Sequence, residues 1–125
     1  MERLATTITV NASGDGVGYI DPTGPGRVLA IRYVKDDYVN NVTLAVTGEK
    51  TGIAILTLGA GAMDSTVTKY PRAAAHAVAD GAALHYNDES DEPVVVPIPV
   101  IDERIKLVVA AGGNGTSGTF YVWVG

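Results

Sequence analysis

The chain segment that decides the fold class is IKLVVA at residues 105–110, followed by AGGNGTSG at 111–118 and TFYVWV at 119–124. Two runs of β-branched and aromatic residues are joined here by glycine and asparagine, which tight turns between strands use. The pattern predicts a β-hairpin. No polar tail follows the second run, so we expect the last strand to be packed within a sheet.

Runs of the same character recur along the rest of the chain, at 7–10, 17–20, 27–34, 42–46, 53–58 and 65–70. Segments rich in glycine, proline or polar residues separate them. The runs at 42–46 and 53–58 predict a second hairpin. Strands at this spacing predict a single all-β domain over residues 1–125, an antiparallel β-sandwich or jelly roll of about eight strands.

Two segments depart from the simple strand pattern. Pro97 and Pro99 interrupt the run at 94–100; because proline cannot donate to a ladder, this strand must lie at a sheet edge or an irregular crossing. The alanine-rich segment 71–86 favours a short helix near 72–80, with Pro71 in its first turn and Gly81 as its stop. An extended connection across the sandwich explains the same segment, and both interpretations stay open.

Composition narrows the classes of partner. The formal net charge is −5, only 18% of residues are charged, and cysteine is absent. An acidic chain without clustered lysine and arginine is a poor ligand for nucleic acid. No run is long enough to span a bilayer and the first residues do not form a signal peptide, so we expect synthesis in a cytoplasm and no membrane partner. The 46% hydrophobic content favours a protein–protein interface.

The residue types that carry catalysis do not form a recognisable constellation. His76 and His85 are the only histidines, and Asp80 would share a helix face with His76, but no third ligand has motif spacing. The acidic run at 88–92 lacks the pattern of a calcium loop. We therefore predict no catalytic residue, no cofactor and no metal. The enzyme alternative is a metal-dependent hydrolase that uses the two histidines.

Tyrosine and tryptophan are the best candidates for contact with a partner, because such amphipathic rings suit interface cores. We select Tyr38, Tyr70 and Tyr86, which flank loops, and Tyr121 and Trp123 in the last strand. The C-terminal hairpin and the loop at 35–41 are the expected contact elements. The alternative is that these rings fill the core or its rim.

The second half of the chain resembles a known class of protein. IPVIDERIKLVVA at 98–110, Gly-Gly-Asn at 112–114 and SGTFYV at 117–122 resemble the C-terminal signature of small virion structural proteins of tailed bacteriophages. YPRAA at 70–74 and GAAL at 81–84 are similar to the middle region of those proteins. The first half is similar to them only in its rhythm of strands and turns.

The resemblance implies a head decoration or cement protein, located in the virion, that binds the major capsid protein. It also implies a homo-oligomer, with a trimer favoured because decoration sits at symmetry axes of the lattice. The family has no catalytic residues to carry over. Two alternatives stay open: a neck, tail or fibre-attachment protein, and a β-sandwich module that binds carbohydrate or a receptor.

Overall fold

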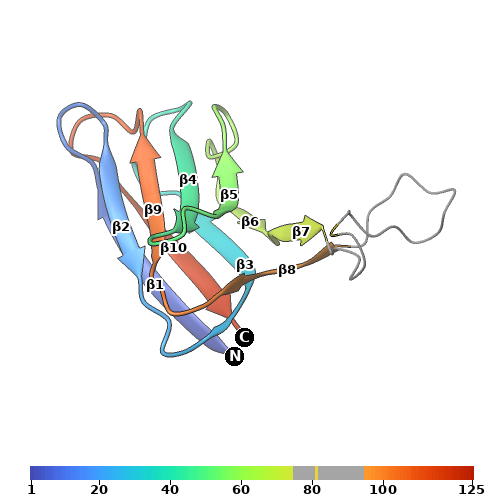
Figure 1. Ribbon diagram of the computed structural model, residues 1–125. Coiled ribbons are helices and arrows are strands. Elements are labelled where there is room, and N and C mark those ends of the chain that lie inside the picture. Colours follow the sequence, from blue (N-terminus) through green and yellow to red (C-terminus); the bar gives the residue numbers. More distant parts are fainter. Residues whose placement is uncertain (75–80, 82–94) are drawn as a thin grey trace, which may run out of the picture.

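The computed structural model describes residues 1–74, 81 and 95–125 (Figure 1). These residues form ten strands and no helix. The strands are β1 (Glu2–Thr9), β2 (Gly16–Ile20), β3 (Gly26–Val34), β4 (Thr43–Gly48), β5 (Ala54–Leu58), β6 (Val67–Lys69), β7 (Arg72–Ala74), β8 (Val95–Val100), β9 (Ile105–Ala110) and β10 (Ser117–Val124).

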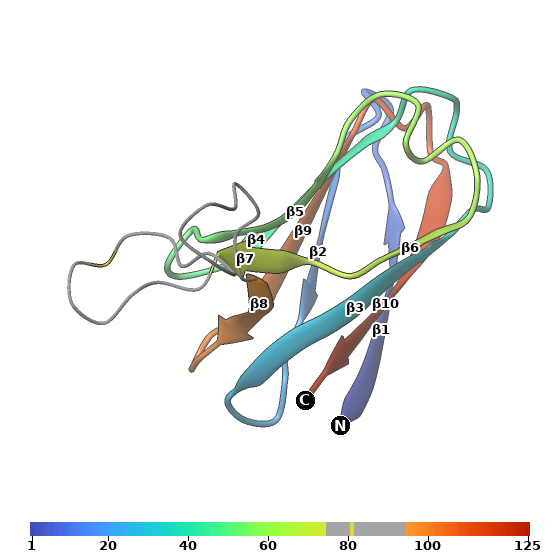
Figure 2. The same ribbon diagram turned by 90° about the vertical axis from the view of Figure 1, so that its right-hand side faces the viewer.

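The strands lie in two sheets that pack face to face (Figure 2). One sheet has the order β1-β10-β3-β8-β7, with β6 also paired to β3, and the other has the order β2-β9-β4-β5. Every pairing is antiparallel. The predicted antiparallel sandwich is confirmed, with ten strands in place of about eight.

The order of pairing is that of a jelly roll. β1 pairs with β10, β2 with β9, β3 with β8 and β4 with β5. The chain is thus one long antiparallel ribbon folded back on itself, and successive pairs of the ribbon belong alternately to the two sheets. Rolling this ribbon brings β10 beside β3 and β9 beside β4, which completes both sheets.

The C-terminal hairpin predicted from residues 105–124 is wrong. β9 belongs to the four-stranded sheet and β10 to the six-stranded sheet, so residues 111–116 cross between layers. The glycines serve this crossing: Gly113 has φ +104°, and the amide of Gly112 donates to the carbonyl of Gly14 in a neighbouring loop, 2.9 Å away. Both strands bury every second residue. This pattern fits two neighbouring strands of one sheet and two strands that face each other across a core, so it does not distinguish a hairpin from a crossing.

The second predicted hairpin is confirmed, since β4 and β5 pair directly, from Leu44 opposite Leu58 to Val46 opposite Leu56.

The two prolines of β8 lie at the irregular crossing that the sequence predicts for them. Pro99 pairs with β3 and Pro97 pairs with β7, so β8 changes partner between them and each half has one partner.

The expected helix near 72–80 is wrong at its start, because Arg72–Ala74 form β7. Pairing with the first half of β8 overrides the helix propensity of alanine there. Residues 75–80 lie outside the described residues. Figure 1 shows β7 and β8 leading away from the body of the sandwich.

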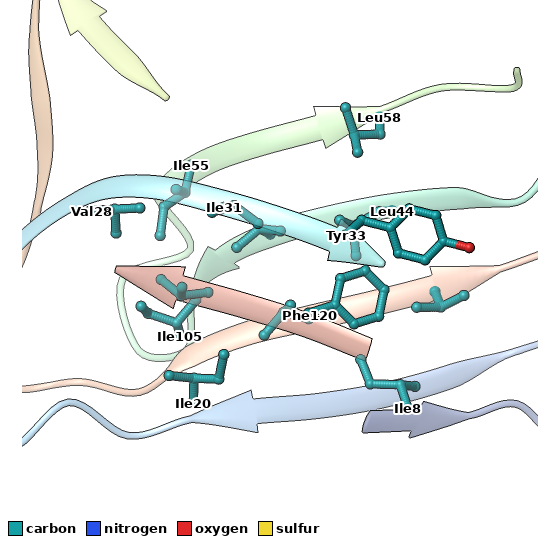
Figure 3. Packing of buried hydrophobic residues seen from close by; sticks show 14 of the residues in the cluster. Ile8, Ile20, Val28, Ile31, Tyr33, Leu44, Ile55, Leu58, Ile105 and Phe120 are labelled. Atoms are coloured by element: carbon teal, nitrogen blue, oxygen red, sulfur yellow. The ribbon is translucent and has the colours of Figure 1, made fainter. Parts of the chain in front are cut away.

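The core lies between the sheets and is built from the inward-facing residue of each alternating pair (Figure 3). Ile105, Leu107 and Val109 of β9 are fully buried, and Phe120 and Val122 of β10 face them. The Phe120 ring packs against Tyr33, with ring centroids 5.3 Å apart. This apolar layer joins the two sheets, so the other residues of each alternating strand are displayed on the two outer faces.

Candidate functional site

The site begins with the outward-facing residues of β10. Because Phe120 and Val122 point into the core, strand alternation places Tyr121 and Trp123 on the opposite, outer face of the six-stranded sheet. Both side chains are half-buried. Their ring centroids lie 6.3 Å apart at an interplanar angle of 38°, so they form one aromatic surface.

A third predicted residue joins this surface from the other side of β3. β6 pairs with β3 and ends at Lys69, which leaves Tyr70 66% exposed beside the sheet. A shallow cavity of about 380 Å³ lies here, and we call it the Trp123 groove. Its lining residues are Met1, Leu29, Ala30, Thr68, Tyr70, Arg72 and Trp123.

Arginine side chains surround these aromatic rings. The guanidinium of Arg3 lies over the Tyr121 ring, 5.4 Å from its centroid. Arg32, opposite Tyr121 in the register, donates to Thr68 Oγ1 at 2.9 Å. Arg72 donates to the carbonyls of Pro71 at 2.7 Å and Leu29 at 3.3 Å. These bonds use only part of each guanidinium, which has five donors.

The charge of this sheet is opposite to that of the chain. Its strands carry five cationic residues and a single acid, Glu2. The carboxylate of Glu2 accepts hydrogen bonds from the amide and hydroxyl of Thr23. The cations are Arg3, Arg27, Arg32, Lys69 and Arg72. Arg3 and Arg32 lie on its outer face, opposite Trp123 and Tyr121, whereas Lys69 lies opposite the buried Ile31 and points to the other side. In a protein of net charge −5, the arginines make the outer face a surface that attracts acidic groups.

Tyr38, the first of the predicted interface residues, is a core residue. It is 3% exposed, its ring stacks on Tyr33 with centroids 6.0 Å apart, and its hydroxyl donates to the carbonyl of Ile8 at 2.5 Å. Burial raises the pKa of this phenol. The loop at 35–41 therefore directs its aromatic ring inward, and Tyr38 offers no contact to a partner.

The structure brings together Tyr70, Tyr121 and Trp123 from the predicted set. Tyr86 lies outside the described residues, as do His76, His85 and the acidic run at 88–92. Sequence reasoning missed the arginines of this surface. Only the pairing of the strands, which the sequence does not give, places Arg3 opposite Trp123 and Arg32 opposite Tyr121.

A second cavity, of about 580 Å³, lies among the loops after β2, β4 and β8. Arg104 forms a bidentate ion pair with Glu49, both N–O distances being 2.5 Å, and its guanidinium lies 4.1 Å from the centroid of the Tyr19 ring. Glu103 accepts hydrogen bonds from the amides of Lys50 and Thr51 at 2.9 and 3.0 Å.

These internal partners account for Glu49 and Glu103, two of the four carboxylates that line the second cavity. The hydrogen bond from Arg104 lowers the pKa of Glu49, and hydrogen bonds from Thr51 and Lys50 lower the pKa of Glu103. Glu103 thus stabilises the turn at residues 50–51, and Glu49 stabilises the position of Arg104. Their hydrogen-bonding capacity serves the loops and not a ligand. We therefore assign this cavity a structural role and place the candidate interface at the Trp123 groove.

Two further findings concern the described part of the chain. It contains no group of three histidine, cysteine, aspartate or glutamate side chains arranged to hold a metal ion. It also contains no helix long and apolar enough to cross a membrane.

Comparison with family models, with curated proteins and with solved structures gives no match to this chain. The functional argument therefore rests on the sequence and on the geometry described above.

Proposed function

We propose that this protein is a structural component of a tailed-bacteriophage virion, a decoration protein that binds the major capsid protein and stabilises the head shell. The observation that carries the proposal is the convergence of Tyr70, Tyr121 and Trp123 on one exposed, arginine-bearing sheet face. The resemblance of residues 98–122 to small virion proteins supports the same function.

The chemistry of the Trp123 groove suits a protein partner. Tryptophan, tyrosine and arginine are the residues that contribute most to binding at protein–protein interfaces. The groove accepts an apolar side chain between Trp123 and Leu29, while Arg3 and Arg32 meet acidic groups around it. The complementary surface on the capsid is therefore an apolar anchor within an acidic rim.

Stabilisation of the shell follows from selective binding. A decoration protein that contacts neighbouring capsid subunits binds the assembled lattice and not the free subunit. Such binding stabilises the assembled state by RT ln(1 + [L]/Kd), which is about 2.7 kcal/mol per site at a free concentration of 100 Kd. We propose that the protein acts as a homo-oligomer, with a trimer favoured at a three-fold site.

The other surfaces argue for the outer face of the six-stranded sheet as the docking face. The outer face of the four-stranded sheet carries Thr43, Ala45 and Val108 side by side, with Lys106 as the only charged residue in those strands. The strands of this sheet carry one exposed aromatic residue, Tyr19, and one charged residue. They therefore offer fewer aromatic anchors and less charge to select a partner than the strands of the six-stranded sheet.

A carbohydrate-binding module would need a different arrangement, in which aromatic rings and carboxylates line one groove. In the described residues Tyr70 and Trp123 line the Trp123 groove, which has no carboxylate in its lining. The carboxylates of Glu49 and Glu103 in the second cavity are hydrogen-bonded within the protein. A receptor-binding function therefore has less support than capsid binding. We expect the isolated protein to bind no glycan on an array.

The test uses phage heads assembled without this protein, to which the purified protein is added back. We expect saturation at hundreds of copies per particle, counted by mass, and a higher temperature of head disruption. About a dozen copies or fewer would instead place the protein at the neck or tail. Binding that leaves shell stability unchanged would contradict the decoration role.

A pair of variants assigns the docking face. Trp123→Ala combined with Arg32→Glu removes the central ring and reverses a charge, and we expect at least a tenfold weaker binding to heads. Tyr19→Ala is the matched control, because Tyr19 is an exposed aromatic residue on the other sheet. Equal binding by both variants would exclude the Trp123 groove.

A further inference from the structure

The six-stranded sheet has an open strand edge at β1. β1 pairs with β10 on one side, over eight consecutive residue pairs without a register shift. On its other side it has no partner among the strands that the structure describes. It is an outermost strand of the sheet (Figure 1). An open strand edge is a template for pairing with another chain.

The hydrogen bonds show which backbone groups are free. The amide of Val10 donates to the carbonyl of Thr116 in the strand pairing, at 2.9 Å. Along an antiparallel strand, the N–H and C=O groups of successive residues point alternately to one side and to the other. The backbone groups of the even-numbered residues of β1 therefore point to β10, as those of Val10 do. The N–H and C=O groups of the odd-numbered residues 3–9 therefore point away from the sheet. No hydrogen bond from the described residues reaches them.

The edge carries little of the protection that natural sheets have, apart from β2 of the other sheet, whose Gly16 comes close to the carbonyl of Thr9. Exposed edges are ordinarily blunted by proline, lysine, a β-bulge or a covering loop. From Leu4 to Thr9 the strand has no charged residue, no proline and no bulge. The contrast is β8, where Pro97 and Pro99 limit pairing. The uncharged part of β1, from Leu4 to Thr9, is therefore suited to pairing.

We propose that β1 pairs with β1 of a second copy of this chain, antiparallel and about a two-fold axis. Opposite residues in such a pair must point to the same face, so one residue faces its own copy across the axis. Ala5 or Thr6, at the middle of β1, is that residue. Arg3 then faces a threonine of the other copy, Thr7 or Thr9, so no like charges meet on the outer face. The strand is thus complementary to itself in length, charge and side-chain size.

The pairing has a consequence that rests on the proposed function. The axis runs through the sheet from face to face, so the outer faces of both copies lie on the same side of one continuous sheet. Both Trp123 grooves then face the same surface. A dimer that binds the capsid through both grooves has a higher overall affinity than one groove alone, because the second contact forms within the same complex. This contact is distinct from the three-fold contact favoured above, and the two can coexist in a larger oligomer.

The solution mass of the purified protein tests the pairing without any capsid. We expect a dimer, twice the chain mass of 12.9 kDa, or an even-numbered oligomer, by light scattering over a range of concentrations. A monomer at the highest concentration would overturn the proposal, and so would a trimer that has no even-numbered form. Because no phage component is present, this result is independent of whether the capsid-binding proposal holds.

Thr7→Pro is the decisive variant. The amide of Thr7 points away from β10, so proline leaves the backbone ladder between β1 and β10 intact. It removes the unpaired amide donor and one exposed side-chain hydrogen bond, between the hydroxyls of Thr7 and Thr119 at 3.2 Å. We expect at least a tenfold increase in the dimer dissociation constant with an unchanged circular dichroism spectrum and melting curve. An unchanged dimer would overturn the edge as the contact.

Ala5→Lys provides a second variant that does not alter the backbone. It brings two ammonium groups together near the proposed axis, and like charges directly opposite destabilise a strand pair. Thr119→Lys is the matched control, because Thr119 lies on the same outer face one strand away from the edge. We expect Ala5→Lys to weaken the dimer and Thr119→Lys to leave it intact, and equal effects would contradict the proposal.

Discussion

Two aromatic clusters occupy opposite faces of the same sheet. The inner cluster is Tyr33, Tyr38 and Phe120, and the outer cluster is Tyr70, Tyr121 and Trp123. β10 contributes to both, since Phe120 points inward and its neighbour Tyr121 points outward. The inner rings are at most 3% exposed, whereas Tyr70 is 66% exposed. The same residue types therefore stabilise the fold on one face and are available for recognition on the other.

The largest effect is expected from Phe120→Ala. Phe120 is fully buried between Tyr33 and the four-stranded sheet, and removing a buried phenyl ring leaves a cavity that costs about 3–5 kcal/mol. We expect the free energy of unfolding, measured by urea denaturation, to fall by that amount. Tyr121→Ala, one residue later on the outer face, should cost far less, and equal losses would contradict the separation of the two clusters.

The next effect concerns the close packing of the inner rings. A Cβ atom on Gly118 would collide with the Tyr38 ring and would lie 2.9 Å from Cε1 of Tyr33. Gly118→Ala should therefore destabilise the protein by about 1–3 kcal/mol, the usual cost of overpacking. Gly24→Ala is the control, because no atom lies within 4 Å of its Cβ position; thermal unfolding distinguishes the two variants.

Gly118 also explains why the burial of Tyr38 was missed. Sequence patterns report local alternation, and Tyr38 stands in a loop where alternation says nothing. Its ring is buried because a glycine eighty residues later leaves room for it in the fold. The exposed Tyr70 has the same local context beside a strand, so the two could not be separated before the topology was known.

The strands themselves were largely predictable, because β-branched residues alternate within them and glycine and proline lie between them. The topology was less so. A glycine-rich connection can join two strands of the same sheet or two strands of different sheets. Only the pairing between residues far apart in the sequence decides between these two cases, and here residues 111–116 cross between the sheets. The segment at 72–74 shows the same limit, since its pairing with β8 overrides the propensity of its alanines.

Alkaline pH should act on the inner cluster first. Burial raises the pKa of Tyr38 and of Tyr33 above the ordinary value of 10.0, so the folded state favours the neutral phenols. This contribution to stability is fully present below about pH 10 and is lost as the pH rises towards the folded pKa values, because the unfolded chain releases these protons first. Urea denaturation from pH 8 to 11 should show the decline, and the double variant with phenylalanine at both positions should reduce it.

A smaller effect separates the two buried phenols. The Tyr38 hydroxyl donates to Ile8 O, whereas the Tyr33 hydroxyl is buried and has no hydrogen-bond partner in the described residues. Tyr38→Phe should lower the free energy of unfolding by about 1 kcal/mol, and Tyr33→Phe should leave it unchanged or raise it. Chemical denaturation of both variants measures the difference, and a larger loss for Tyr33→Phe would reverse this assignment.

The smallest effect on stability is expected from Tyr70→Ala in the outer cluster. Its ring is mostly in solvent, so its removal exposes no core and should change the free energy of unfolding by less than about 0.5 kcal/mol. Its effect on head binding should be larger, because the ring lines the Trp123 groove and would be covered by a partner. A variant that unfolds like the original protein but binds heads more weakly would separate recognition from stability. Unchanged binding would instead confine the docking face to Trp123 and the arginines beside it.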